Sequence, residues 1–185
     1  CRDESQMSET TSITRQDAPL PHLQERIHAM PDAIQFGEDT QRLAVSCFVR
    51  NALCGVDTEP VQEIVKVGHI TPVHHAPDYV VGIMNLRGRV VTVIDVGMKL
   101  DLGAIPLTPD SRILIISWQG EALGLLIDNV RGVVPIDRAE MKPPPENVRG
   151  VQSDMVEGVC QVDDHLMALL DLRSVLGVDD EHARN

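Results

Sequence analysis

Aromatic residues are almost absent from this sequence, whose 185 residues include one tryptophan, one tyrosine and two phenylalanines. A surface that stacks nucleobases needs several aromatic side chains, so their scarcity argues against a nucleic-acid platform. Basic residues are also few, because 16 lysines and arginines stand against 28 acidic residues and give a formal net charge of −12. Such a surface repels phosphate backbones. We therefore expect no nucleic acid among the partners of this chain.

Long hydrophobic runs are missing as well. A membrane-spanning helix needs roughly 20 consecutive apolar residues, and no run in this sequence approaches that length. No apolar segment typical of a secretion signal is found near the N-terminus. We therefore expect a cytoplasmic protein without direct membrane insertion.

Catalytic and metal-binding signatures are lacking too. The sequence contains no G-x-S-x-G, P-loop or H-E-x-x-H pattern and no paired carboxylates at catalytic spacing. His74 and His75 are adjacent, and adjacent residues of a strand point to opposite faces, so the two do not readily bind one metal ion. We expect no enzyme, no metal site and no cofactor. An enzyme or metal protein that uses the histidines and cysteines is the alternative.

Cysteine is sparse and irregularly spaced. Neither C-x-x-C nor zinc-ligand spacing occurs among Cys1, Cys47, Cys54 and Cys160. Three of them lie in apolar, strand-like runs, where a thiol acts as a small hydrophobic side chain. A disulfide between Cys47 and Cys54 is the less favoured alternative, because disulfides are rare in a reducing cytosol.

What the sequence does contain is aliphatic. Hydrophobic residues make up 43% of it, in short Val, Ile and Leu runs broken by Gly and Pro, which predicts an all-β fold. Its organising stretch is Val80–Val96, where two apolar runs flank Asn85-Leu86-Arg87-Gly88-Arg89. Glycine supplies the positive φ that a tight reversal can require. We predict a hairpin whose turn displays Arg87.

The rest of the chain divides into a polar lead-in, a folded body and a tail. Residues 1–40 are predicted to be disordered or partly helical, with one short amphipathic helix at Leu20–Met30. In the body we predict hairpins at 42–57, 112–127 and 155–170, a strand at 129–136, a helical turn after Pro60 with Val61, Ile64 and Val65 facing inward, a proline-shaped linker at 68–79, a helical turn and loop at 97–111, a long surface loop at 141–154, and a short helix between Asp171 and Gly177. Residues 179–185 are predicted to be a flexible tail.

The body contains an internal repeat. Residues 42–57 align with 112–128, with Phe48 opposite Trp118, and residues 82–96 align without a gap with 158–172. One sequence thus encodes two similar lobes, a first at about 42–96 with C-terminal contributions and a second at about 97–172. About five short strands per lobe are enough for a small filled barrel. We expect the two barrels to share a hydrophobic seam.

The repeat also separates scaffold from function. Positions that match in both copies serve the common fold, such as Asp95 and Asp171, whereas positions that differ are free to carry function. The two hairpin tips differ in charge sign: Arg87-Gly88-Arg89 aligns with Asp163-Asp164-His165, and Glu63 aligns with Gly132. Arg87 and Glu63 are therefore candidate site residues.

Between Arg42 and Val178 the chain resembles the CheW family, the coupling proteins of bacterial chemosensory arrays. The resemblance rests on VQEI (61–64), ITP (70–72), APDYVVGIMNLRG (76–88), VVTVIDV (90–96), GLLIDNV (124–130) and the ending GV to LLDL (158–172). It implies a CheW-like domain at 41–178, made of two intertwined five-stranded SH3-like barrels with short helical turns and preceded by the polar extension. Where the family pattern often has a linker proline, this chain has His74.

The resemblance also implies an adaptor without catalysis. Its partners would be the cytoplasmic tip of a methyl-accepting chemoreceptor, the regulatory domain of a CheA-type histidine kinase, and other CheW-like proteins in array rings, which places the chain at membrane-bound arrays. Residue by residue, it implies receptor binding at Val61, Glu63 and Gly82 and kinase binding at Ile70, Thr71, Arg87 and Gly88. A CheW-like part of a larger kinase or of a CheV-type regulator is the alternative.

Overall fold

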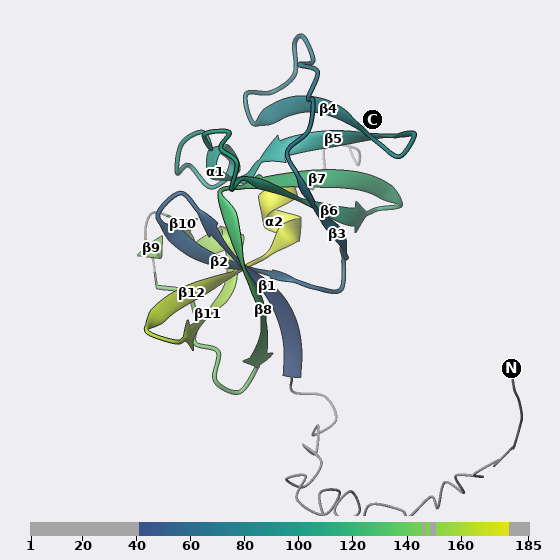
Figure 1. The fold of residues 1–185 in the computed structure, drawn as a ribbon. Coiled ribbons are helices and arrows are strands. Elements are labelled where there is room, and N and C mark those ends of the chain that lie inside the picture. The colour runs from purple at the N-terminus through teal and green to yellow at the C-terminus, as the bar shows by residue number, and fades with distance from the viewer. Residues whose placement is uncertain (1–40, 146, 149–150, 178–185) are drawn as a thin grey trace, which may run out of the picture. The chain divides into compact units, whose positions relative to one another are not determined.

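A computed structural model describes residues 41–145, 147–148 and 151–177, and these residues form a mostly β structure (Figure 1). The expectations for residues 1–40 and 179–185 lie outside the described residues. The strands are β1 (Gln41–Val49), β2 (Ala52–Asp57), β3 (Val61–Lys66), β4 (Val80–Leu86), β5 (Arg89–Asp95), β6 (Arg112–Trp118), β7 (Glu121–Ile127), β8 (Asn129–Asp137), β9 (Asn147–Val148), β10 (Val151–Gln152), β11 (Val156–Val162) and β12 (His165–Leu170). The helices are α1 (Val96–Lys99), α2 (Leu172–Leu176) and a 3₁₀ turn at Ser153–Met155.

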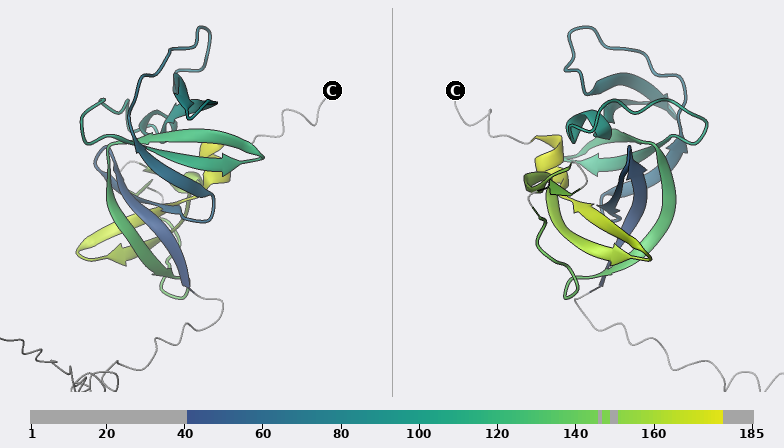
Figure 2. Two further views of the ribbon diagram at one scale, coloured as in Figure 1. Left: turned by 45° about the vertical axis from the view of Figure 1, so that its right-hand side comes forward. Right: turned by 90° about the vertical axis from the view of Figure 1, so that its left-hand side faces the viewer.

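Ten of these strands form two five-stranded mixed sheets that curl into barrels (Figure 2). Barrel 1 has the order β3-β6-β7-β5-β4 and comes from residues 61–127. Barrel 2 has the order β11-β12-β2-β1-β8 and comes from residues 41–57 and 129–170. Neighbouring strands are antiparallel except for β5 with β7 and β2 with β12, which are parallel. The all-β prediction of two intertwined five-stranded barrels is confirmed.

The expected lobes, one at about 42–96 with C-terminal contributions and one at about 97–172, do not coincide with the two barrels. Each barrel combines the first hairpin of one repeat copy with the last three strands of the other copy. The chain passes from barrel 2 to barrel 1 between β2 and β3, at residues 58–60, and returns at Asp128. Both copies carry the same strand pattern, so the sequence alone did not show which hairpin meets which strands.

The repeat itself is visible in the strand registers. In β4–β5, Gly82 pairs with Val93 just after a bulge, and Gly158 pairs with Leu169 just after the equivalent bulge of β11–β12. The first hairpins also match, but one residue away from the sequence alignment. Val49 precedes its two-residue turn as Trp118 precedes the corresponding one, so Val49 rather than Phe48 takes the place of Trp118.

The core joins both barrels. One large cluster combines buried residues of β1 and β2 with those of β5, β6 and β7, which is the shared seam that the repeat predicted. Representative fully buried members are Val45, Cys54, Val93, Leu114 and Leu125. A second cluster lies within barrel 2 and consists of Ala44, Leu53, Ile136, Cys160, Met167 and Leu169. Burying such aliphatic side chains is the main force that holds β-structures together.

The two α-helices begin at equivalent aspartates, as the repeat predicted. Asp95 accepts a hydrogen bond from the amide of Met98 and Asp171 accepts one from the amide of Arg173, so both act as N-caps. Gly177 ends α2 in the left-handed conformation, with a φ of 61°.

Two local predictions were wrong. Residues 61–66 are a strand and not a helical turn, because the Pro60 carbonyl accepts the Ser117 amide at 2.8 Å and β3 then pairs with β6. Ile64 consequently faces outward rather than inward. The predicted surface loop at 141–154 contains the short β9–β10 hairpin and the 3₁₀ turn.

Candidate functional site

The tip of the β4–β5 hairpin is fixed by an ion pair. Arg87 and Gly88 form a two-residue turn with φ values of 51° and 84°, and the Gly88 amide donates to Asn85 Oδ1 at 2.8 Å. Arg87 Nη2 and Nη1 donate to Glu63 Oε2 and Oε1 at 2.8 and 3.2 Å. Because β3 and β4 are the two edge strands of their sheet, this bidentate pair links the edges and helps to close barrel 1. The prediction that the turn displays Arg87 is confirmed, since its side chain is 77% exposed.

A second contact brings Gly82 against the linker. Thr71 and Ile83 exchange backbone hydrogen bonds of 2.8 Å, so the linker touches the outer edge of β4 at one point. A Cβ atom on Gly82 would lie 2.3 Å from the Thr71 carbonyl oxygen and 2.8 Å from Ile70 Cγ2. The φ of Gly82 is +150°. Glycine is therefore required at this position, where two backbones meet closely.

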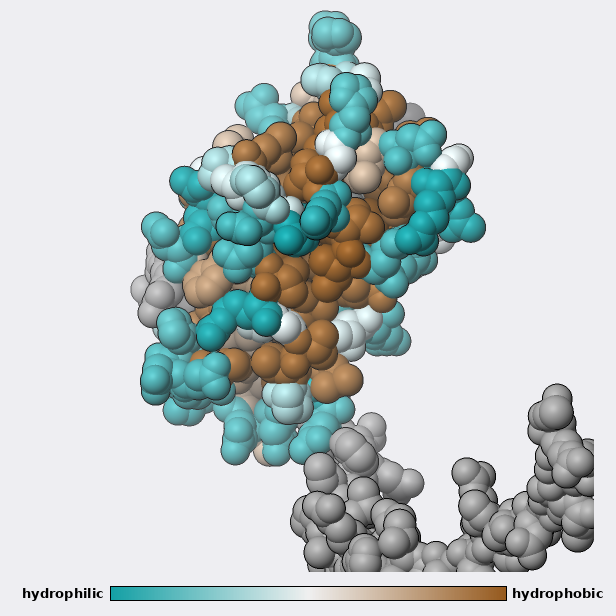
Figure 3. Space-filling model, viewed as in Figure 1, coloured by the Kyte–Doolittle hydropathy of each residue, from teal (hydrophilic) through white to brown (hydrophobic). Residues whose placement is uncertain are grey.

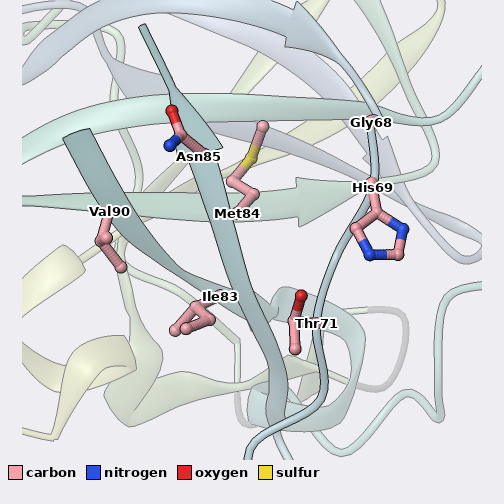
Figure 4. Close-up of a pocket in the computed structure, with 7 residues that line it drawn as sticks. All are labelled: Gly68, His69, Thr71, Ile83, Met84, Asn85 and Val90. Carbon is pink, nitrogen blue, oxygen red and sulfur yellow. The ribbon is translucent and has the colours of Figure 1, made fainter. Parts of the chain in front are cut away.

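Beyond this contact the linker and β4 separate around a cavity of about 290 Å³ (Figure 4). We call it the linker pocket; its walls are Gly68, His69, Thr71, Ile83, Met84, Asn85 and Val90. Figure 4 shows Met84, Asn85 and Ile83 on the β4 side, Gly68, His69 and Thr71 across from them, and Val90 on β5. The pocket therefore borders Thr71, one of the predicted kinase-binding residues.

Another cavity, of about 340 Å³, lies at the open end of barrel 1, and we call it the mouth cavity. Its polar lining residues are Gln62, Glu63, Arg87 and Arg89, and its apolar ones are Leu86, Val91, Ile115 and Ala122. The closing ion pair thus lies on the wall of this cavity. Arg89 lies beside it at the start of β5 and is exposed.

Barrel 2 also has an ion pair between an edge strand and a hairpin tip, although its arginine takes the place of Gln62 and not that of Glu63. Arg131 of β8 lies 3.7 Å from the carboxylate of Asp163, which is in the turn between β11 and β12. The Arg131 guanidinium also lies 5.9 Å from the ring centre of Phe48, and the face of an aromatic ring attracts a positive charge. In both barrels an edge strand is therefore linked to the opposite hairpin tip.

An exposed apolar surface was missed by the sequence reasoning. Leu43 of β1 and Val133 of β8 are 52% and 54% exposed, and Leu43 lies opposite Pro135, two residues from Val133. Figure 3 shows a band of hydrophobic residues over β1 and β8 that continues toward β3, where Ile64 is also exposed. The sequence signal for this surface was that β8 carries valines on both faces. A strand with one face in water normally alternates apolar and polar residues. We call Leu43, Ile64 and Val133 the apolar face.

A third cavity, of about 540 Å³, is lined by residues of both barrels, including Trp118 and Arg42. Arg42 Nε donates to Asp57 at 2.7 Å and its Nη1 donates to Glu157 at 2.6 Å. Burial lowers the pKa of Arg42, but the hydrogen bonds and the negative charges of Asp57 and Glu157 outweigh it, so the pKa is raised above its ordinary value. The charge of this arginine is therefore balanced within the chain.

The described thiols are free and buried. Cys47 and Cys54 are direct cross-strand partners, and burial raises the pKa of Cys54 to about 12 and that of Cys47 well above its ordinary value. Thiols held in the neutral form are poor nucleophiles. Among the described residues no three His, Cys, Asp or Glu side chains are grouped to hold a metal ion. None of the described helices is long and apolar enough to cross a membrane.

Two intertwined barrels that present an ion-paired hairpin and an exposed apolar face define a protein-interaction module. The model of the CheW-like domain matches residues 44–180 of this chain. Two relatives named "Chemotaxis protein CheW" are each 28% identical to it: that of Treponema pallidum over 74% of this chain and 83% of the relative, and that of Bacillus subtilis over 65% and 78%. The crystal structure of the scaffolding protein TtCheW from Thermoanaerobacter tengcongensis superposes with a TM-score of 0.69 at 31% identity, covering 80% of this chain and 95% of that one. The chain belongs to the CheW family, and it is a non-enzymatic adaptor for coupling and scaffolding in chemotaxis.

Proposed function

We propose that this adaptor joins the cytoplasmic tip of a chemoreceptor to the regulatory domain of a CheA-type histidine kinase. The receptor side consists of Val61, Glu63 and Gly82. The kinase side consists of Ile70, Thr71, Arg87 and Gly88. Other CheW-like proteins are neighbours of this chain in membrane-bound receptor arrays in the cytoplasm.

The observation that carries this proposal is that residues of the two sides touch each other. Glu63 of the receptor side holds Arg87 of the kinase side through two hydrogen bonds. Gly82 of the receptor side lies directly against the backbone of Thr71 of the kinase side. A displacement caused by one partner is therefore passed to the surface of the other without an intervening flexible segment.

The apolar face supports a helical receptor partner. A helix that packs its apolar stripe against another protein needs a surface of exposed aliphatic side chains. Leu43, Ile64 and Val133 provide exposed aliphatic side chains, and Ile64 points outward from β3 while its neighbour Glu63 points to the mouth cavity. We assign the receptor helix to this face and to the adjoining part of β3.

Co-sedimentation with receptor-containing membranes tests the proposal. The chain, a CheA-type kinase and the membranes are mixed, and kinase in the pellet is measured. We expect Arg87→Asp to abolish kinase recruitment and Val133→Asp to remove the adaptor itself from the pellet. Arg138→Asp is the matched control, because Arg138 is an exposed arginine outside both surfaces. Kinase recruitment that is unchanged by Arg87→Asp would contradict the proposal.

A further inference from the structure

Arg89 differs from its neighbour Arg87 in having no partner among the residues that the structure describes. Arg87 directs both terminal nitrogens at Glu63. Arg89 also lines the mouth cavity, yet it makes no ion pair or side-chain hydrogen bond with any residue that the structure describes. In a chain with a formal net charge of −12, an unpaired guanidinium at the rim of a cavity is available to a ligand.

The internal repeat shows that the barrel does not require this arginine. Both barrels have an ion pair between an edge strand and a hairpin tip, Glu63 with Arg87 and Arg131 with Asp163, although Arg131 takes the place of Gln62. The residue equivalent to Arg89 in barrel 2 is His165, because each pairs with the last strand residue before its hairpin turn. His165 is half-buried. An ion pair at this end is therefore common to both barrels, and a guanidinium at the start of β5 is particular to barrel 1.

The cavity beside Arg89 suits a side chain that combines a short aliphatic part with a carboxylate. Its apolar lining residues are Leu86, Val91, Ile115 and Ala122. The free guanidinium lies at its rim, where it can form two parallel hydrogen bonds with a carboxylate. The neighbouring carboxylate of Glu63 is occupied by Arg87 and does not compete for Arg89.

We propose that Arg89 recognises the kinase partner by binding a glutamate or aspartate side chain of the kinase regulatory domain in the mouth cavity. Arg87 then acts as a positioning residue that closes the barrel and places the hairpin tip. This inference rests on the proposed function and names the chemistry of its kinase-facing surface.

Binding of the purified full chain to the isolated kinase regulatory domain, followed by calorimetry, tests the assignment. We expect Arg89→Glu to weaken binding by about tenfold or more and Arg89→Lys by only about threefold. Lysine keeps the positive charge but cannot form the two parallel hydrogen bonds of a guanidinium. Arg138→Glu changes the net charge equally at an exposed site outside the cavity and serves as the control. The loss of affinity caused by Arg89→Glu is expected to be smaller at high salt. A compensating Glu→Arg change on the partner is expected to restore binding to the Arg89→Glu variant.

The possible outcomes separate the two proposals. Binding of Arg89→Glu and Arg89→Ala within about twofold of the wild type, beside a strong loss for Arg87→Glu, would overturn the assignment and leave the proposed function standing. An equal loss for Arg138→Glu would also overturn it, because the effect would then be one of net charge. Absence of any binding by the wild-type chain would contradict the proposed function itself. Thermal melting of each variant shows that the comparison is made on folded protein.

Discussion

Arg87 binds Glu63 through both terminal nitrogens of its guanidinium, and the two residues come from opposite edges of one five-stranded sheet. The pair is therefore both an exposed feature of the hairpin tip and a clasp between the first and last strands of barrel 1. In barrel 2, Arg131 and Asp163 form a longer contact of 3.7 Å between an edge strand and a hairpin tip, with Arg131 in the place of Gln62. Both barrels thus have an ion pair at this end, while the two tips present opposite charges.

A double-mutant cycle measures the strength of this clasp. We expect Glu63→Ala, Arg87→Ala and the double variant to give a coupling free energy of about 0.5–1 kcal/mol, the upper part of the range for exposed ion pairs, because the contact is bidentate. The Arg131–Asp163 pair, at 3.7 Å rather than 2.8 Å, is expected to give a smaller value. Urea denaturation provides the free energies of unfolding. A coupling near zero at Glu63 would show that the pair is not a clasp.

Gly82 and Gly88 provide a matched pair of glycine substitutions. A Cβ at Gly82 would meet the Thr71 carbonyl oxygen at 2.3 Å, whereas a Cβ at Gly88 has no neighbour within 4 Å. We expect Gly82→Ala to lower the free energy of unfolding by more than about 2 kcal/mol, and Gly88→Ala by about 1 kcal/mol from backbone strain alone. Denaturant titration compares the two variants. Equal losses of stability would show that the linker backbone moves away from the added Cβ atom at little cost in free energy.

The two N-cap aspartates are equivalent in sequence but not in burial. Asp95 is buried, and its second oxygen accepts the Ile105 amide at 2.9 Å, whereas the second oxygen of Asp171 accepts the Ser174 hydroxyl near the surface. We expect Asp171→Ala to cost about 1 kcal/mol and Asp95→Ala about 2–3 kcal/mol, because it leaves a buried amide unsatisfied. Thermal or denaturant unfolding measures the loss of stability in each variant. A larger loss for Asp171→Ala than for Asp95→Ala would contradict this expectation.

The buried thiols predict a decline in stability at alkaline pH. Burial raises the pKa of Cys54 from an ordinary 9.0 to about 12 and raises the pKa of Cys47 as well. Above pH 9 the unfolded chain releases thiol protons that the folded chain retains, so the free energy of unfolding falls as pH rises from about 9 toward 12. Below pH 9 both states keep their protons and these groups contribute no change.

Stability curves between pH 8 and pH 11 check this prediction, with Cys54→Ala as the comparison. We expect the alkaline decline to be shallower in the variant. A thiol reagent at neutral pH should label Cys47 and Cys54 only when the protein unfolds, since neutral buried thiols react slowly. Rapid labelling of the folded chain would contradict the burial of these residues.

The sequence predicted much of the fold because the relevant signals are local. Alternating apolar residues, two-residue turns and a capping aspartate specify hairpins and a helix start within a few residues, and these predictions hold at β4–β5, β11–β12 and Asp171. The partition of strands between barrels is non-local. Strand β3 pairs with β6, whose residues lie more than forty positions further along the chain. No local pattern in β3 distinguishes this pairing from pairing within its own repeat copy.

The candidate site was predictable to a similar extent. Comparison of the two repeat copies pointed to Glu63 and Arg87, and the structure brings them into contact. It did not predict that Arg87 pairs with Glu63 while Arg89 has no partner in the described part of the chain, because that difference depends on which side chain β3 presents at the barrel mouth. The exposure of Leu43 and Val133 likewise depends on β8 being the edge strand of barrel 2.

The chain enters barrel 1 at residues 58–60 and leaves it at Asp128. Every residue assigned to partner binding by family resemblance, from Val61 to Gly88, falls inside this uninterrupted stretch, and so does Arg89. One gene segment therefore encodes the whole recognition hairpin together with the scaffold that shapes it. Chimeras between relatives, joined at these two positions, would transfer the kinase-facing residues as one unit and leave barrel 2, with Leu43 and Val133 of the apolar face, unchanged.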